Sequence, residues 1–210
     1  MSYVIAIDFE AFGGVTPRNG ACQMGAVLFD MNVGQVVDKF NMYIKQDWFS
    51  EEQRCIDEFW NSTPTLAKRR WEIVDNCKRI GVNADECMDL FYRWIDEKVP
   101  RDYSCYIITD KAPFDAGILR YFSRKNDPLY AFHEYRQIVD INMVCLGIAK
   151  IPLDHAVMNH ISAKKEAARI LGVSLPDHGN PEAHDPVDDA EYIARVWYAI
   201  QYKLKKIQKS

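Results

Sequence analysis

Three stretches of the chain carry acidic residues where a strand or helix would normally present apolar side chains. The first is Ile5-Ala6-Ile7-Asp8-Phe9-Glu10, in which Asp8 and Glu10 are two residues apart and therefore point to the same face of a strand. Two carboxylates this close repel each other unless a cation lies between them, and hard oxygen ligands of this kind suit Mg²⁺. The alternative is a strand that simply ends at the protein surface.

The second stretch is Phe114-Asp115. Three, four and seven residues after Asp115 come Ile118, Leu119 and Phe122, so Asp115 lies on the apolar face of a helix, in its first turn. The helix dipole alone would favour an aspartate there. The position therefore predicts either a helix-stabilising charge or a carboxylate that faces a buried site.

The third stretch runs from His184 to Asp189. Pro186 suits the first position of a helix with Asp185 as its N-cap. Asp189 then shares the buried face of that helix with Ile193, Val196 and Trp197. His184 lies just outside the helix, where a histidine is commonly a surface residue. Each of the three stretches is a modest signal by itself, and it is their joint occurrence that indicates a functional site.

Apolar runs and turn residues predict the elements that would position these groups. Strands are predicted at Tyr3–Phe9, Cys22–Phe29, Gln35–Ile44 and Tyr103–Thr109, with a weaker one at Gln137–Ile141. Helices are predicted at about Thr65–Ile80, from Pro113 to about Arg124, and at Ser162–Leu171 and Pro186–Ile207. The patterns Ser50-x-x-Gln53 and Asn83-x-x-Glu86 resemble the capping boxes of two more helices.

This order of elements predicts an α/β fold, with three antiparallel strands and then parallel strands in one mixed sheet flanked by helices. No linker-like segment divides residues 1–210, so we expect a single domain. The loop Gly172–Asp185 contains Pro176, Gly179 and Pro181 and is expected to be mobile.

Composition excludes several classes of protein. Apolar residues make up 48% and charged residues 27% of the 210 residues, the mix of a globular protein. The net charge of -4 argues against broad, charge-driven binding of duplex DNA. No run approaches the roughly 18–20 apolar residues of a membrane span, and the N-terminus does not resemble a signal peptide. Six scattered cysteines without a CxxC pair indicate a reducing, cytoplasmic location.

Together, Asp8-x-Glu10, Phe114-Asp115 and His184-x4-Asp189 resemble the three motifs of the DEDDh (DnaQ-like) 3'–5' exonucleases, which have a ribonuclease H-like fold. The order, spacing and strand or helix context match, and the motifs span positions 8 to 189. The segment Ala21–Val27 is also similar to the strand that follows the first motif in that family.

A looser resemblance connects the chain to the phage and mycobacterial exoribonuclease-like branch, through Ile56–Trp60 and through Tyr135-Arg136 with Asp140-Ile141. One departure is visible: many relatives have Asn or Ser shortly before the second motif, where this chain has Asp110-Lys111-Ala112.

The resemblance implies a catalytic site of Asp8, Glu10, Asp115, His184 and Asp189. The four carboxylates would hold two divalent cations, Mg²⁺ or Mn²⁺, which stabilise the entering and leaving oxygens during phosphodiester hydrolysis. Asp8 would bridge both cations, Glu10 and Asp189 would hold the one that carries the attacking water, and Asp115 would orient the second through water. His184 would be the general base, because its ordinary pKa lies near working pH.

The resemblance also implies a single-stranded RNA or DNA 3' end as substrate, nucleoside 5'-monophosphates as products, and a possible homodimer. Ala11 and Phe12 would contact the terminal nucleotide, although Phe12 could equally be a packed core aromatic. The basic groups Lys68-Arg69-Arg70 and Lys203-Lys205-Lys206 could follow a single strand, but solvated helix faces are the simpler interpretation.

Two alternatives stay open. The same fold could be a catalytically inactive nucleic-acid-binding or scaffold module, although all five catalytic positions are filled. The pair His184-Asp185, with His155, His160 and His178, could instead belong to a helical metal phosphohydrolase of the HD type. The apolar strand Tyr3–Phe9 argues against the second alternative, and nothing in these motifs separates RNA from DNA.

Overall fold

A computed structural model of the protein describes residues 2–13, 21–45, 52–99, 104–122, 138–179 and 184–209. At its centre lies a five-stranded sheet in the order β3-β2-β1-β4-β5. The strands are β1 (Ser2–Ala11), β2 (Ala21–Asp30), β3 (Gln35–Tyr43), β4 (Ser104–Thr109) and β5 (Ile138–Asp140). Strands β1 to β3 pair antiparallel, whereas β4 and β5 continue parallel to β1. The predicted mixed sheet is confirmed.

The central strand β1 is buried on both faces. Val4 and Ala6 belong to the apolar core on one side of the sheet, and Ile5 and Ile7 belong to the core on the other, all at 0% exposure. A strand covered on both faces reads as a continuous apolar run rather than an alternation, because neither face meets water. The two carboxylates that interrupt this run therefore lie at the end of the most buried strand.

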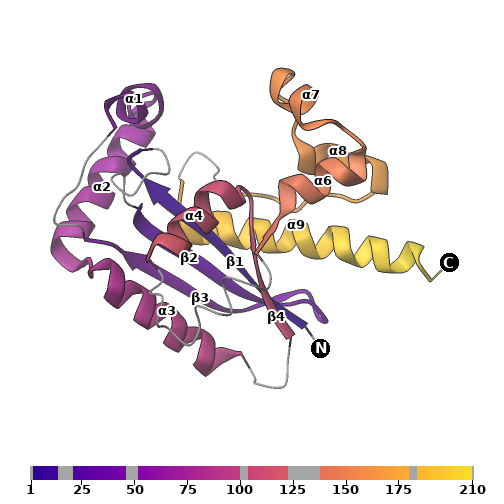
Figure 1. Cartoon of the computed structure of the whole chain (residues 1–210), viewed down its shortest axis with the longest axis horizontal. Coiled ribbons are helices and arrows are strands. Elements are labelled where there is room, and N and C mark those ends of the chain that lie inside the picture. Colours follow the sequence, from indigo (N-terminus) through magenta and orange to yellow (C-terminus); the bar gives the residue numbers. More distant parts are fainter. Residues whose placement is uncertain are drawn as a thin grey trace.

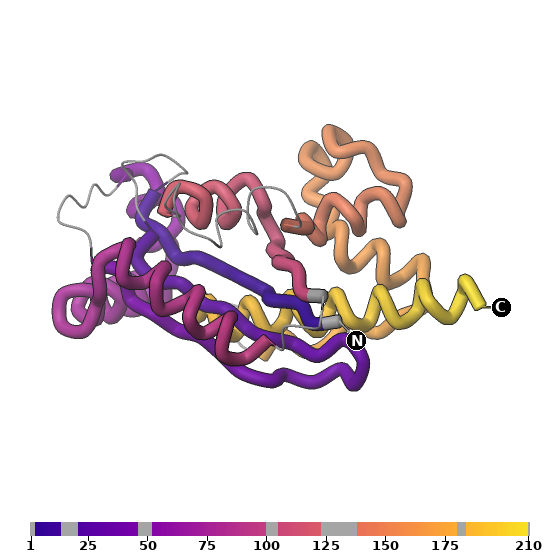
Figure 2. Tube along the Cα trace, turned by 60° about the horizontal axis from the view of Figure 1, so that its bottom comes forward, coloured from indigo at the N-terminus to yellow at the C-terminus, as the bar shows by residue number. Residues whose placement is uncertain are grey.

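Helices cover both faces of the sheet (Figure 1). Helices α3 (Ala84–Lys98) and α4 (Ala112–Phe122) pack on the face of Ile5 and Ile7, while α9 (Pro186–Ile207) packs on the other face with α6 (Ile141–Ala149), α7 (Leu153–Met158) and α8 (Ala163–Leu171). Figures 1 and 2 show α6 to α8 gathered beside the C-terminal half of α9. The remaining helices are α1 (Gln53–Cys55), the π-helical turn η1 (Ile56–Trp60) and α2 (Pro64–Ile80).

Helix α9 can approach the sheet closely because β2 carries a glycine opposite its first turn. A Cβ atom on Gly25 would lie 2.2 Å from the carbonyl carbon of Pro186 and 2.5 Å from the amide nitrogen of Val187. Asp185 caps the helix, accepting hydrogen bonds from the backbone N–H groups of Val187 at 3.0 Å and Asp188 at 3.4 Å. The predicted start of this helix, which places Asp189, is confirmed.

The structure adds two helices to those predicted, confirms one capping residue and leaves another outside the described residues. Helices α6 and α7 were not predicted, although Asp140 is the N-cap of α6 and accepts a 2.9 Å hydrogen bond from the amide of Met143. The cap at Asn83 is confirmed, because its side chain accepts a 2.8 Å hydrogen bond from the amide of Glu86. Ser50 lies outside the described residues, and helix α1 instead follows Glu52, which makes no side-chain cap bond.

The loop expected over Gly172–Asp185 has no helix or strand where it is described, and residues 180–183 lie outside the description. So do Tyr135 and Arg136, which carried part of the looser resemblance. Within the described parts of the chain, no helix combines the length and apolar character needed to cross a bilayer.

Candidate active site

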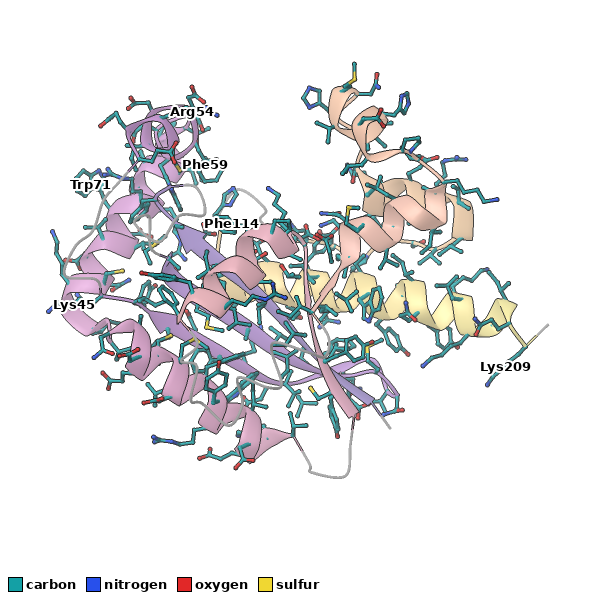
Figure 3. The ribbon with its side chains drawn as sticks, viewed as in Figure 1. Lys45, Arg54, Phe59, Trp71, Phe114 and Lys209 are labelled. Carbon is teal, nitrogen blue, oxygen red and sulfur yellow. The ribbon has the colours of Figure 1, made fainter. Side chains whose placement is uncertain are left out.

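All five residues predicted to form the catalytic site line one cavity of about 550 Å³. Asp8 and Glu10 come from β1, Asp115 from the first turn of α4, and Asp189 from the first turn of α9, with His184 just before that helix. Aromatic side chains of Phe59 and Phe114, labelled in Figure 3, also line the cavity. Residues far apart in the sequence therefore converge where three elements begin or end.

Asp115 is held by two hydrogen bonds in a nearly closed environment, with 2% of its surface exposed. Its Oδ1 accepts a 3.1 Å bond from the backbone N–H of Phe9, and its Oδ2 accepts a bond from the hydroxyl of Thr109. Burial raises the pKa of Asp115 to about 7, although both hydrogen bonds oppose this change. The carboxylate thus joins α4 to the end of β1 and lies at a fixed position.

Burial also raises the pKa values of Asp8 and Glu10 well above their ordinary range. For Asp8 the next contributions are the charges of Asp115 and Glu10, and for Glu10 the charge of Asp189. Asp8 is partly exposed to the cavity, whereas Glu10 is 6% exposed. The charges of neighbouring carboxylates therefore oppose the ionisation of Asp8 and Glu10, and the charge of Arg69 opposes this effect at Glu10.

Asp189 has a neighbour that was not assigned to this site from the sequence. The Nε2 atom of His178 lies 2.7 Å from Oδ1 of Asp189, and the imidazole packs against the ring of Tyr192 with centroids 4.1 Å apart. Burial raises the pKa of Asp189, and His178 and His184 oppose that effect. From the sequence, His178 entered only the alternative of a helical HD-type site, which the mixed sheet excludes.

His184 adopts a left-handed backbone conformation with φ of 45°, which is uncommon for a residue other than glycine. Its ring meets the ring of Phe59 edge to face at 4.9 Å between centroids, and its Nδ1 lies 3.9 Å from Oε1 of Glu10. Burial lowers the pKa of the imidazole, despite the opposing charge of Asp189. The lowered pKa favours the neutral imidazole, the form that can accept a proton.

Arg69 of α2 anchors the segment that carries His184. Its Nη2 donates to Oε1 of Gln23 at 2.8 Å and contacts Oδ2 of Asp185 at 3.3 Å, and its Nε donates to the carbonyl of His184 at 3.4 Å. The solvated-face interpretation is wrong for Arg69, whose side chain is 13% exposed, and for Arg70, which is buried over the ring of Phe12. Lys68 alone of the three is exposed.

The two residues expected to contact substrate have different surroundings. Ala11 lines the cavity, and its carbonyl accepts a 3.1 Å bond from the indole of Trp60. Phe12 is 1% exposed and packs edge to face on Trp60 with ring centroids 5.2 Å apart. Of the two alternatives for Phe12, the structure favours the packed core aromatic, since the ring has no surface on which a base could stack.

Lys111 and Asp110, where the chain departs from the family pattern, lie at the cavity wall. Oδ2 of Asp110 forms an ion pair with Nζ of Lys164 from α8. The same Nζ atom lies 5.1 Å from the centre of the Tyr192 ring. Lys164 was not singled out from the sequence. The pair brings α8 to the edge of the carboxylate cluster.

The donor atoms fit divalent cations that prefer oxygen ligands. Glu10 and Asp189 each offer a carboxylate oxygen, and these two atoms and a ring nitrogen of His184 lie within 4.8 Å of one another. Asp8 and Asp115 add hard oxygen atoms from the same cavity wall. A cluster whose carboxylates raise one another's pKa gains free energy when a cation neutralises it.

Comparisons with known proteins bear on the family and the fold of the chain. Residues 4–201 match the family model of the Rv2179c-like 3'-5' exoribonuclease domain. Among curated protein sequences, none matches the chain. Among solved structures, the nuclease domain of 3'hExo, a DEDDh family member bound to rAMP, is similar with a TM-score of 0.63 at 16% identity, covering 100% of this chain and 93% of that one.

Two further solved structures share the fold. Cell-death related nuclease 4 (CRN-4) has a TM-score of 0.63 at 15% identity, and the match covers 96% of this chain and 64% of the CRN-4 chain. E. coli Exonuclease I in complex with a dT13 oligonucleotide has a TM-score of 0.60 at 15% identity, covering 100% of this chain and 43% of that one. At these identities the likeness concerns the ribonuclease H-like fold.

Proposed function

The chain belongs to the Rv2179c-like 3'-5' exoribonuclease domain family and is a DEDDh 3'-5' exonuclease, and from this premise we propose how it acts and on what. It hydrolyses the last phosphodiester bond of a single-stranded RNA or DNA and releases a nucleoside 5'-monophosphate. It works as a single domain, and its catalytic residues are Asp8, Glu10, Asp115, His184 and Asp189.

One observation carries the proposal: carboxylates from β1, α4 and α9 meet in one cavity, and burial and mutual repulsion raise their pKa values. Carboxylates with strongly raised pKa values that gather in one cavity are typical of functional sites, because each such group lowers stability at neutral pH. Two divalent cations, Mg²⁺ or Mn²⁺, fit this set of oxygen donors. When bound, they would neutralise the scissile phosphate and lower the pKa of the attacking water.

The chain's own residues supply the rest of the chemistry. Asp115 is fixed by Phe9 and Thr109, so its carboxylate needs no rearrangement to hold a ligand. His184 accepts the proton of the attacking water, because its lowered pKa favours the neutral ring. Phe59 packs against that ring and limits its rotation, and Arg69 holds the backbone at the same residue.

The substrate is a strand end rather than a duplex. The cavity is large enough for one nucleotide, and Ala11 and Phe59 form part of its wall. The net charge of -4 supports local engagement of one 3' end, since wide phosphate binding requires many basic residues. The family description favours RNA, and RNA is therefore the first substrate to test.

The experiment uses 5'-labelled RNA and DNA oligonucleotides with a free 3' hydroxyl or a 3' phosphate, in Mg²⁺, Mn²⁺ or EDTA. We expect a ladder that shortens from the 3' end, only with a cation, and slower cutting of the blocked strand. Internal cutting, or hydrolysis that continues in EDTA, would contradict the proposal. Binding of the strand without hydrolysis in any buffer would favour the inactive module instead.

A further inference from the structure

A second hollow of about 410 Å³ opens beside the catalytic cavity. Its apolar walls come from Phe114 at the start of α4, Met143 and Leu146 on α6, and Leu153 on α7. Figure 1 shows α4 facing the α6 and α7 pair across this part of the molecule. We call this hollow the Met143 groove, after the residue at its exposed edge.

The Met143 groove borders the catalytic cavity. Asp110, Lys111 and Phe114 line both hollows. Phe114 directly precedes Asp115 and is half-buried. Its side chain lines both the cavity that holds the carboxylate cluster and the groove. A strand whose end lies among the carboxylates would therefore reach the groove by passing these three shared residues.

The chemistry of the groove fits a nucleotide. Met143 and Leu153 are 49% and 53% exposed, an unusual apolar surface beside a site built from charged groups. A nucleobase is flat and largely apolar on its faces, so it gains free energy against such walls, and exposed Lys111 lies at the junction where a backbone phosphate would pass. A stable protein partner would require roughly 800 Å² on each side, a much larger surface.

We propose that the Met143 groove binds the base of the penultimate nucleotide, the one that becomes the new 3' end after each cut. This inference rests on the proposed function, in which the terminal nucleotide occupies the cavity beside Ala11 and Phe59. The strand then leaves past Phe114, with its next base in the groove. The groove thereby selects single strands, since a paired base could not enter it.

The test compares two double variants of exposed apolar residues. Met143→Ser with Leu153→Ser removes the groove walls, and Val157→Ser with Met158→Ser is the matched control, because these residues are 66% and 78% exposed on α7 and do not line the groove. On a 5'-labelled RNA, the groove variant is expected to lose roughly tenfold in kcat/KM, while the control keeps the wild-type value.

Two further substrates show whether the loss of kcat/KM in the groove variant depends on the penultimate base. On an RNA with an abasic penultimate nucleotide, the groove variant should match the wild type, because the base that would contact the groove is missing. On the p-nitrophenyl ester of thymidine 5'-monophosphate, which has no preceding nucleotide, the two proteins should also be equal. These equalities separate loss of a subsite from damage to the catalytic cavity.

The results that would overturn the proposed subsite differ from those that would overturn the proposed function. Equal kcat/KM of the groove variant and wild type on intact RNA would overturn the subsite and leave the apolar surface to another partner. A defect that persists on the penultimate abasic strand but disappears when the terminal nucleotide is abasic would assign the groove to the terminal base. If the wild type cuts none of these substrates, the proposed function fails rather than the subsite.

Discussion

Replacing Asp115 with asparagine is expected to change how the stability of the cation-free protein depends on pH. Asp115 is 2% exposed, and burial raises its pKa from an ordinary value near 3.8 to about 7. Asparagine has the same shape and keeps an oxygen that can accept the bond from the amide of Phe9. The variant therefore removes the titrating group while preserving the packing of α4 against β1.

Whether stability rises or falls with pH depends on which state, folded or unfolded, binds the proton of Asp115 more tightly. Because the folded state has the higher pKa, it binds the proton more tightly than the unfolded state, so the contribution of Asp115 to stability is complete below about pH 4 and is lost as pH rises to about 7. At 1.36 kcal/mol for each pKa unit, the loss amounts to about 4 kcal/mol. The variant lacks this loss and should exceed the wild type in stability at pH 8.

Urea denaturation in EDTA at several pH values between 4.5 and 8 measures this difference. The free energy of unfolding of the variant, minus that of the wild type, should rise with pH by up to about 4 kcal/mol. Asp89→Asn, at an exposed position on α3, is the matched control and should follow the wild type. Parallel curves for the wild type and Asp115→Asn would refute the reasoning, because the carboxyl group would then titrate alike in both states.

Substitutions at four further positions test single features of the structure. Asp8→Asn should abolish nuclease activity and leave the cation-free fold as stable as, or slightly more stable than, the wild type in a thermal melt; a wild-type rate would contradict the cation assignment. His184→Ala should lower kcat by roughly 100- to 10,000-fold and keep Mn²⁺ affinity in calorimetry; unchanged kinetics near neutral pH would remove it as the base. Arg69→Met should lower kcat by roughly tenfold, with partial rescue by Arg69→Lys, because the carbonyl of His184 and the carboxylate of Asp185 lose their donor; equal kcat in all three proteins would rule out a positioning role. Gly25→Ala should destabilise the protein by about 3 kcal/mol in urea denaturation, since its Cβ would overlap the backbone of α9; wild-type stability would mean that α9 does not pack so closely.

The carboxylate cluster could be predicted because three of its members break a local rule and all four match the motif spacing of a known exonuclease family. Asp8 and Glu10 end a buried strand, and Asp189 lies on the apolar face of a helix that Pro186 and Asp185 start. Such conflicts between charge and apolar context are visible in one stretch of sequence at a time. The strand segments were predictable for a similar reason, since apolar runs and turns are local signals.

Arg69 and His178 show what local patterns miss. The guanidinium of Arg69 meets Gln23, Asp185 and the carbonyl of His184, and the last two follow it by more than 100 positions in the chain. A basic triplet on a helix is usually solvated, and only the packing of α2 against β2 makes this one different. The contact between His178 and Asp189 likewise depends on how a loop folds back on α9.

Helix α6 was missed because it begins directly at the end of β5. Its residues are mainly apolar, so they lack the alternation of polar and apolar positions that marks a helix with one exposed face. The local signal was Asp140, whose carboxylate caps the first turn. Recognising that cap would have predicted the helix that carries Met143, and with it one wall of the Met143 groove.

The number of Mn²⁺ ions that the protein binds tests the central claim most directly. Electron paramagnetic resonance of free Mn²⁺, titrated in the presence of a nucleoside 5'-monophosphate, counts the bound ions without relying on activity. We predict two ions for each wild-type chain and at most one for Asp8→Asn. No bound ions, or the same number in both proteins, would contradict a site in which these carboxylates hold two cations.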